Sequence, residues 1–385
     1  AATLKHYICN NQEFERMTTN SVVSERALRE IYLRAFEIAI QKGDPWSVMS
    51  SYNQVNGEWV NSNQHICDLL RKELGYEGVV VSDFAAVHRT KVEPHNCGMM
   101  DIELAPTDIH TQELLDAVHA GLVKEETLDR GLERVFDLIG KIADTKPMTV
   151  DMDDLHQKAQ TAAEKCMVLL KNDGLLPLKN TSGKLAVCGP LADESLRDWY
   201  TGVYRDAVSV KDGFSSEFPD CEVVHDSLWD IVSIKAPNGK FLSAKADGSI
   251  IADADSISVS EQFELQDWGE NWINLFSLKY KRYVRNTDGE LKLHNRTIHD
   301  WFTHETFNFK RTDNGQLIEE FLGHQRLTCD ENGKLSFTAR KAVLSDVLFE
   351  TETVSSGSER AAALAAECDT VIYCTGNYPV QVAKE

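Results

Sequence analysis

The chain has 385 residues, of which 42% are hydrophobic and 26% are charged. This balance is typical of a globular chain with about two to three domains. It excludes a collagen-like, wholly disordered or membrane-spanning protein, since no apolar run approaches the ~20 residues of a membrane span. The formal net charge of −21 disfavours nucleic acids and anionic membranes as partners, because an acidic surface repels phosphate groups.

The first 147 residues alternate between helical and strand patterns. Apolar residues recur at helical spacing over residues 24–39, where Ser24 is the expected N-cap, and over residues 114–142. Residues 46–52 and 79–84 are short apolar runs typical of buried strands. Because nearly continuous β-branched runs suit parallel strands covered on both faces, we expect βα units of an α/β fold.

A second α/β region is expected to begin near residue 148, after a linker around Pro147. Residues 156–172 have a helical pattern, and residues 184–190 form an apolar strand. A helix followed by a buried strand returns in residues 361–377. These segments predict a single α/β sandwich that is interrupted by the residues between them.

The intervening residues 231–352 have an all-β texture, in which Gly, Asn and Asp punctuate short strands. Three copies can be aligned, because Phe263, Phe307 and Phe349 fall in register at spacings of 44 and 42 residues. Turn signals coincide in the copies, at Asp247-Gly248, Asp288-Gly289 and Asn332-Gly333. Three such copies can close one core around a pseudo-threefold axis. The pattern resembles a β-trefoil of the fascin-like or ricin-like kind.

Polar residues lie at the ends of three strands expected in the first region. Lys5 and His6 close one strand, Met49 and Tyr52 follow the next, and Asp83 follows the third. In α/β folds ligands gather at the carboxyl ends of strands, and a carboxylate buried there is costly unless it is paired. Asp83 is therefore a candidate catalytic residue. The alternative is a loop carboxylate that caps the next helix.

Several sequence runs in this region resemble glycoside hydrolase family 3, the family of β-glucosidases and β-xylosidases. They are KHYICNNQEFER, ERALREIYLRAFEIAI, VMSSYNQVNG, LLRKELGYEGVVVSDF and GMMDIEL. The later run AAEKCMVLLKNDGLLPL is similar to the family's passage from its (β/α)8 barrel into its α/β sandwich. The resemblance covers residues 1–205 and 359–385.

The resemblance and the repeat together predict an α/β multidomain chain with an inserted β-trefoil. The expected parts are the C-terminal portion of a (β/α)8 catalytic barrel over residues 1–147, an α/β sandwich over residues 148–230 and 353–385, and the trefoil over residues 231–352. In the family, earlier barrel strands carry an Asp and an Arg that hold the sugar. Neither can be assigned here, so the chain is expected to be a segment of a longer polypeptide.

Two catalytic carboxylates follow from the resemblance. Asp83 matches the nucleophile of the family's Ser-Asp-Trp motif, with Phe84 in place of Trp. The family's general acid/base is a Glu on a sandwich loop after a strand that ends in Gly-Asn, which corresponds to Glu385 in YCTGNYPVQVAKE. The Asp-Arg pair that commonly follows in the family is absent. Retaining hydrolysis needs two carboxyl groups about 5–5.5 Å apart, one ionised and one held protonated.

The resemblance also implies a sugar-binding subsite. Lys5 and His6 match the pair that donates hydrogen bonds to sugar hydroxyls, and Phe84 offers an apolar face beside the nucleophile. Arg16 and Tyr52 match further groups of this subsite, and Met49 lines it. Lys5 and Arg16 are also the cations expected to keep the nucleophile ionised.

The leading prediction is a retaining exo-β-glycosidase, a β-glucosidase that acts on β-glucosides or cello-oligosaccharides. The alternatives are a β-xylosidase of the same family, a phosphorylase variant, and a non-catalytic carbohydrate-binding protein that uses the trefoil. No cofactor, metal, nucleic acid or membrane is expected as a partner, and a homodimer is left open. Nine cysteines without zinc-site spacing favour a reducing compartment such as the cytoplasm, with a secretion signal since removed as the alternative.

Overall fold

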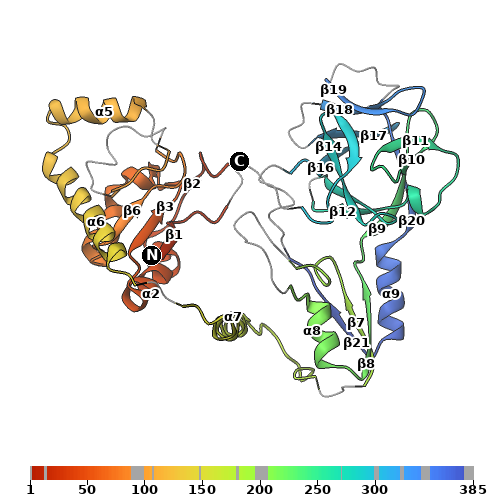
Figure 1. Ribbon diagram of the computed structural model, residues 1–385, viewed down its shortest axis with the longest axis horizontal. Coiled ribbons are helices and arrows are strands. Elements are labelled where there is room, and N and C mark those ends of the chain that lie inside the picture. The colour runs from red at the N-terminus through yellow and green to blue at the C-terminus, as the bar shows by residue number, and fades with distance from the viewer. Residues whose placement is uncertain are drawn as a thin grey trace. The chain divides into compact units, whose positions relative to one another are not determined.

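A computed structural model describes most of the chain (Figure 1). The described residues are 2–12, 15–87, 99–105, 108–146, 149–178, 182–195, 207–269, 271–298, 303–320, 325–339 and 347–376. They form two compact units, the first over Ala1–Val168 and the second over Leu169–Ala383.

A parallel sheet forms the centre of the first unit. Its described strands are β1 (Thr3–Tyr7), β3 (Ser47–Ser50) and β6 (Val79–Val81), in the order β1-β3-β6. All three residues of β6 are buried, as its β-branched sequence predicts. Beyond β6, Val81 forms a parallel bridge with Ile102, so a further extended segment continues the same direction.

The first unit also contains several helices (Figure 1). The first helical run comprises α1 (Glu25–Ala27), η1 (Leu28–Leu33) and α2 (Arg34–Gly43). It begins where expected, since the Ser24 side chain accepts a hydrogen bond from the Ala27 N–H. The others are η2 (Val60–Ser62), α3 (Gln64–Asp68), η3 (Leu69–Glu73), α5 (Asp108–His119), α6 (Glu125–Ala143) and α7 (Met152–Cys166), beside the short strands β2 (Asn20–Ser21), β4 (Gln54–Val55) and β5 (Glu58–Trp59).

The helix expected over residues 156–172 is shorter than predicted at its C-terminal end. Helix α7 ends at Cys166, and Met167 has an extended backbone with φ −73° and ψ 131°. The next residues, Met167 to Leu170, are all exposed. This run is apolar at every position, so it lacks the polar face that an amphipathic helix presents to solvent. Among the described residues, no helix has the length and apolar character that crossing a membrane requires.

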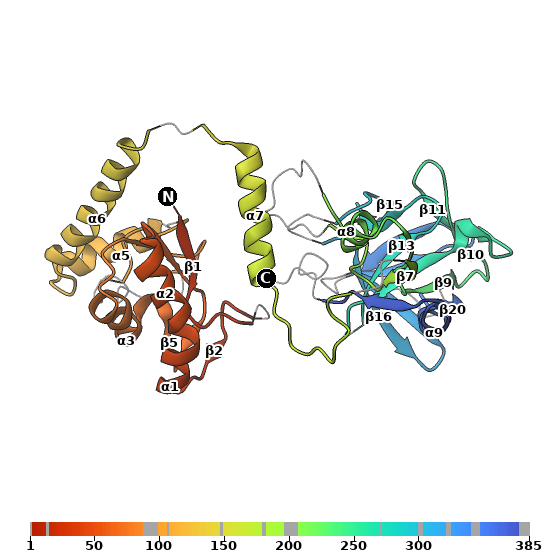
Figure 2. The same ribbon diagram turned by 90° about the horizontal axis from the view of Figure 1, so that it is seen from below.

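The second unit contains a small parallel sheet in the order β21-β7-β8. Its described strands are β7 (Gly183–Cys188), β8 (Cys221–Asp226) and β21 (Thr370–Tyr373). Helix α8 (Val210–Glu217) lies on one side of it and helix α9 (Gly357–Glu367) on the other (Figures 1 and 2). Strands from both ends of the region thus share one sheet, as the predicted interruption requires.

A separate antiparallel sheet of twelve strands accounts for the described residues between β8 and α9. In chain order these strands are β9 (Asp230–Lys235), β10 (Phe241–Ala244), β11 (Ile250–Ala254), β12 (Phe263–Asp267), β13 (Trp272–Ser277), β14 (Arg282–Thr287), β15 (Glu290–Leu293), β16 (Thr306–Thr312), β17 (Gly315–Glu320), β18 (Gln325–Cys329), β19 (Leu335–Ala339) and β20 (Glu350–Ser355). The short turn η4 (Val259–Glu261) precedes β12. One continuous hydrophobic core lies within this all-β part.

Equivalent residues of the three copies have similar surroundings in the all-β part. Phe263, Phe307 and Phe349, which the repeat aligns, are all fully buried in its core. The glycines of the three predicted turns all have positive φ, and each accepts one hydrogen bond from the next copy. These bonds are Leu293 N–H to Gly248 O at 2.7 Å, Phe337 N–H to Gly289 O at 2.7 Å and Ala252 N–H to Gly333 O at 2.9 Å. Copy one thus meets copy two, copy two meets copy three, and copy three returns to copy one.

The chain passes from the α/β sheet into the all-β part between β8 and β9, and returns between β20 and α9. These two connecting segments are held together. Strand β20 pairs antiparallel with β9. The Arg360 guanidinium of α9 donates to both carboxylate oxygens of Asp226, at 2.7 and 3.1 Å, and to the Trp229 carbonyl at 2.7 Å. A bidentate pair of this kind fixes orientation as well as distance.

We expect Gly333→Ala to destabilise the second unit far more than Gly239→Ala. Both glycines have φ +81°, so each alanine carries the left-handed strain of about 1–2 kcal/mol. A Cβ at Gly333 would lie 2.2 Å from the Ala252 carbonyl oxygen, whereas nothing lies within 4 Å at Gly239. The total cost for Gly333→Ala is therefore about 2–5 kcal/mol. Urea unfolding measures both, and equal losses would contradict the close approach of copies one and three.

Candidate active site

Asp83 lies two residues beyond β6, at the carboxyl end of the parallel sheet. Its side chain is almost buried, with 9% of the residue exposed. The Phe84 N–H donates to its Oδ1 at 2.8 Å. Ser82 holds the backbone in place next to Asp83. Its N–H donates to the Ile102 carbonyl and its hydroxyl donates to the Asp83 carbonyl, both at 2.9 Å. The strand end thus presents one oriented carboxylate.

His6 is a side chain that contacts this carboxylate. Its Nε2 lies 3.2 Å from Asp83 Oδ2. His6 is carried by β1 and Asp83 follows β6, and β3 lies between these two strands. Residues far apart in sequence therefore meet because parallel strands end at the same edge.

Tyr52 and Arg16 form a second layer beside the carboxylate. The Tyr52 hydroxyl donates to the Phe84 carbonyl at 2.9 Å, and the Arg16 Cζ lies 4.6 Å from the centre of the Tyr52 ring. Burial raises the pKa of Tyr52 to about 12, with a smaller contribution from the Asp83 charge. The phenol is therefore neutral at ordinary pH and acts as a donor. The structure thus brings together four of the predicted residues, which are His6, Arg16, Tyr52 and Asp83.

The structure describes the positions of three of the other predicted site residues but not of the fourth. Lys5 lies in β1 with an exposed side chain, and Met49 is half-buried in β3, where it pairs with Val81. Phe84 is 66% exposed, so its ring is available to a ligand at the sheet edge. Glu385, the predicted general acid/base, lies outside the described residues.

A buried carboxylate that sequence reasoning missed supports the strand before Asp83. Asp101 is buried, with 1% of its side chain exposed, and its Oδ2 accepts hydrogen bonds from the Val80 N–H at 2.8 Å and from Arg71 at 2.7 Å. Its Oδ1 accepts from Arg134 of α6 at 2.9 Å. The signal in the sequence was an acidic residue inside the apolar run GMMDIEL, since a buried carboxylate needs charged partners.

We expect the first unit of Tyr52→Phe to lose less unfolding free energy than that of the parent chain when the pH is raised above about 10. The neutral phenol is favoured in the folded unit, because its pKa is about 12 there and near 10 when exposed. Its contribution is fully present below about pH 10 and is lost as the pH rises through about 12. Unfolding free energy measured against pH should therefore fall less steeply in Tyr52→Phe than in the parent chain. An unchanged slope would contradict the burial of this hydroxyl.

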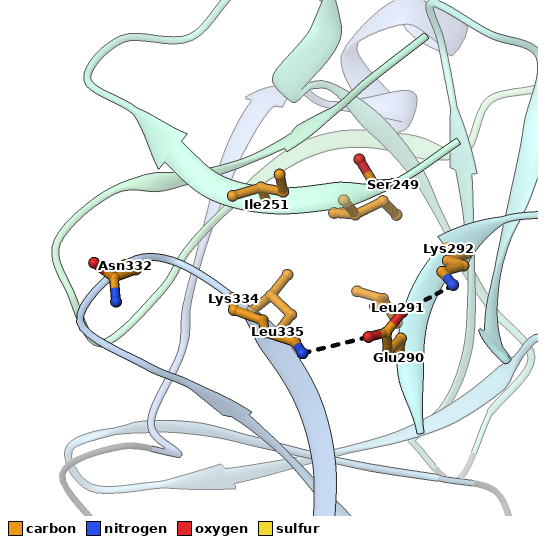
Figure 3. A pocket seen from close by; sticks show the side chains of 9 residues that line it. Ser249, Ile251, Glu290, Leu291, Lys292, Asn332, Lys334 and Leu335 are labelled. Carbon is orange, nitrogen blue, oxygen red and sulfur yellow. Dashed lines mark ion pairs between the residues drawn. The ribbon is translucent and has the colours of Figure 1, made fainter. Parts of the chain in front are cut away.

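A pocket of about 320 Å³ in the second unit lies where the three copies of the repeat meet (Figure 3). Ile250, Leu291 and Leu335, two residues after the three turn glycines, are buried beneath it. At the rim Glu290 pairs with Lys292 at 2.8 Å and with Lys334 at 3.5 Å. Equivalent positions of all three copies line the pocket, so closure of the repeat accounts for it. Within the described ranges no group of three His, Cys, Asp or Glu residues could hold a metal ion.

Comparison with protein families matches both units. The N-terminal domain of glycosyl hydrolase family 3 matches residues 1–138, and the C-terminal domain of the same family matches residues 167–385, which is more than half of the chain. The chain belongs to glycosyl hydrolase family 3. This confirms the family inferred from the sequence runs and assigns both regions to one enzyme family.

Curated relatives of this family member are β-glucosidases. The chain is 41% identical over 194 residues to thermostable β-glucosidase B of Acetivibrio thermocellus, a match that covers 49% of this chain and 25% of the relative. It is 40% identical over 202 residues to β-glucosidase B of Emericella nidulans, with 49% of this chain and 24% of the relative covered. The chain thus spans about a quarter of the length of these relatives.

One solved structure matches nearly the whole chain. It is the β-glucosidase of Kluyveromyces marxianus, which is 19% identical, has a TM-score of 0.53, and is aligned over 99% of this chain and 53% of its own. At this identity the likeness concerns the fold alone. It supports a mixed α/β multidomain architecture of the family type.

Proposed function

We propose that the protein is a retaining exo-β-glycosidase that hydrolyses terminal β-linked glucose from β-glucosides or cello-oligosaccharides. The observation that carries the proposal is the Asp83 carboxylate at the carboxyl end of β6, oriented by the Phe84 N–H and contacted by His6 at 3.2 Å. Membership of the family and the β-glucosidase relatives support the substrate class.

In the proposed first step Asp83 attacks the anomeric carbon of the sugar. A bond forms between a carboxylate oxygen and C1, and the bond from C1 to the leaving oxygen breaks as that oxygen takes a proton from a general acid. Glu385 remains the predicted acid. In the second step the same group removes a proton from water, and the resulting attack on C1 releases Asp83 and the sugar.

The remaining residues would bind and orient the sugar. Lys5 and His6 can donate hydrogen bonds to its hydroxyls, and the exposed Phe84 ring can contact its C–H face. Arg16 stacks on the Tyr52 ring, which keeps both side chains next to the carboxylate. Met49 would supply an apolar lining from β3.

Two architectural proposals accompany this function. The parallel order of β1, β3, β6 and the Ile102 segment supports a portion of a (β/α)8 barrel in the first unit. The cyclic hydrogen bonds at Gly248, Gly289 and Gly333 support a β-trefoil between β9 and β20.

Mechanism-based labelling tests the proposed nucleophile. The complete polypeptide that contains this chain is incubated with 2-deoxy-2-fluoro-β-glucosyl fluoride, digested and examined by mass spectrometry. We expect a stable fluoroglucosyl adduct on the peptide that contains Asp83, since the fluorine slows release more than attachment. Glucose in excess should protect that peptide. A folded polypeptide that hydrolyses β-glucosides but carries the label on another carboxylate would overturn the assignment of Asp83.

A further inference from the structure

A polar cavity of about 470 Å³ lies in the all-β part, far along the sequence from Asp83. Residues from the end of β14 and its turn line it, together with residues after β15, before β16 and at the end of β17. The polar ones are Arg285, Asn286, Thr287, Asp288, His294, His304 and Glu320. Its volume is within the ~300–1,000 Å³ typical of small-molecule sites.

The first copy of the repeat can be compared with the second copy, whose residues line this cavity. Two residues before the buried phenylalanine, the first and second copies carry Glu261 and Glu305, and both are buried. In the first copy Glu261 accepts hydrogen bonds from the hydroxyls of Ser243 and Ser258, each at 2.6 Å. Small hydroxyl groups therefore satisfy the carboxylate locally.

In the second copy a guanidinium and an imidazole contact the corresponding carboxylate. Glu305, with 2% of its side chain exposed, lies 3.1 Å from His294 Nδ1 and 3.4 Å from an Arg285 nitrogen. His294 and Arg285 also line the cavity. The buried glutamate thus anchors two donor groups at the cavity wall, and a guanidinium has five N–H donors to share among acceptors. Closure of the repeat does not require this arrangement, because the first copy closes without it.

The charges of the lining select among ligands. The buried Glu305 offsets the charge of Arg285, while Asp288 and Glu320 add two negative charges. The cavity is therefore unfavourable for an anion. It offers both N–H donors and carboxylate acceptors, which suits a neutral molecule whose hydroxyl groups both donate and accept.

We propose that this cavity is a sugar-binding site separate from the Asp83 site, and that it holds one glucosyl unit of a neutral β-glucan. The choice of a glucosyl unit rests on the proposed function, whereas the choice of a neutral polyol rests on the lining. In this site the Glu320 carboxylate accepts hydrogen bonds from sugar hydroxyls. The Asn286 side chain holds that carboxylate, since Asn286 Nδ2 donates to Glu320 Oε2 at 3.2 Å.

Affinity gel electrophoresis of the complete polypeptide tests the site, with soluble barley β-glucan as the probe. The variant Glu320→Gln keeps an acceptor for Asn286 but loses the carboxylate charge. Its matched control is Asp313→Asn, which removes one charge from an exposed position between β16 and β17. We expect the glucan to retard the parent and Asp313→Asn equally, and to bind Glu320→Gln about tenfold more weakly, as when a hydrogen bond to a charged group is lost.

Two further arms separate this proposal from the hydrolase. Asp83→Asn should abolish hydrolysis and keep the retardation, and anionic carboxymethylcellulose should retard the protein less than the neutral glucan. Retardation that Asp83→Asn abolishes and Glu320→Gln leaves intact would place all binding at the Asp83 site and overturn this proposal. Stronger retardation by the anionic polymer would overturn it too. If Asp83→Asn hydrolyses normally while Glu320→Gln binds weakly, the proposed hydrolase mechanism fails and the sugar site stands.

Discussion

Asp83→Asn in the complete polypeptide is expected to lower kcat for an aryl β-glucoside by about 10⁴-fold or more, the scale seen when a catalytic nucleophile is removed. The asparagine can still accept the Phe84 N–H, which reaches Oδ1 at 2.8 Å, so the strand end should keep its geometry. What the substitution removes is the anion that attacks C1. Because ground-state binding of the sugar depends on other groups, KM should change much less than kcat.

The control for this substitution is Asp116→Asn in α5, where the side chain is exposed and accepts a hydrogen bond from Gln112. This variant should keep the parent kcat. The smaller Asp83→Ala should regain turnover when azide is added, because the small anion can attack C1 in place of the carboxylate, and the azide product should have the opposite anomeric configuration. Full activity of Asp83→Asn would exclude this residue as the nucleophile.

The part of the site that could be predicted from sequence is the part fixed by strand order. His6, Tyr52 and Asp83 each follow or close an apolar run, and parallel strands bring such positions to one edge whatever packs around them. The partner of Asp83 was harder to predict. Lys5 and Arg16 were the expected cations, and their role beside Asp83 stays a prediction. The sequence did not single out His6, which contacts Asp83 at 3.2 Å, because alternation along a strand decides which neighbouring side chain points to a given face.

Features that depend on contacts between side chains far apart in the sequence were harder to predict. The repeat predicted the buried Phe263, Phe307 and Phe349, since a core position recurs with the backbone. It did not predict the cavity beside Arg285, because that cavity exists only where one copy departs from the others. The early end of α7 was missed for a related reason, since continuous apolar sequence is compatible with a buried helix or an extended segment until its surroundings are known.

Asp101→Asn is expected to destabilise the first unit by about 3–5 kcal/mol, the cost of removing one partner from a buried ion pair. The side chains of Arg71 and Arg134 are 10% and 16% exposed and both donate to this carboxylate, at 2.7 and 2.9 Å. An amide leaves two largely buried guanidinium groups facing each other without a compensating charge. The amide oxygen can still accept the Val80 N–H, so the effect isolates the charge rather than the backbone hydrogen bond.

The matched control is Asp68→Asn, which removes the partner of Lys72 in an ion pair whose side chains are 34% and 71% exposed. Exposed pairs contribute about 0–1 kcal/mol, so this variant should unfold at nearly the parent urea concentration. In Asp101→Asn the urea midpoint should fall with an unchanged m-value, because the same surface is exposed on unfolding. If the two variants lose equal stability, Arg71 and Arg134 are solvated in place, and Asp101 cannot be the group that holds β6 and α6 together behind the nucleophile.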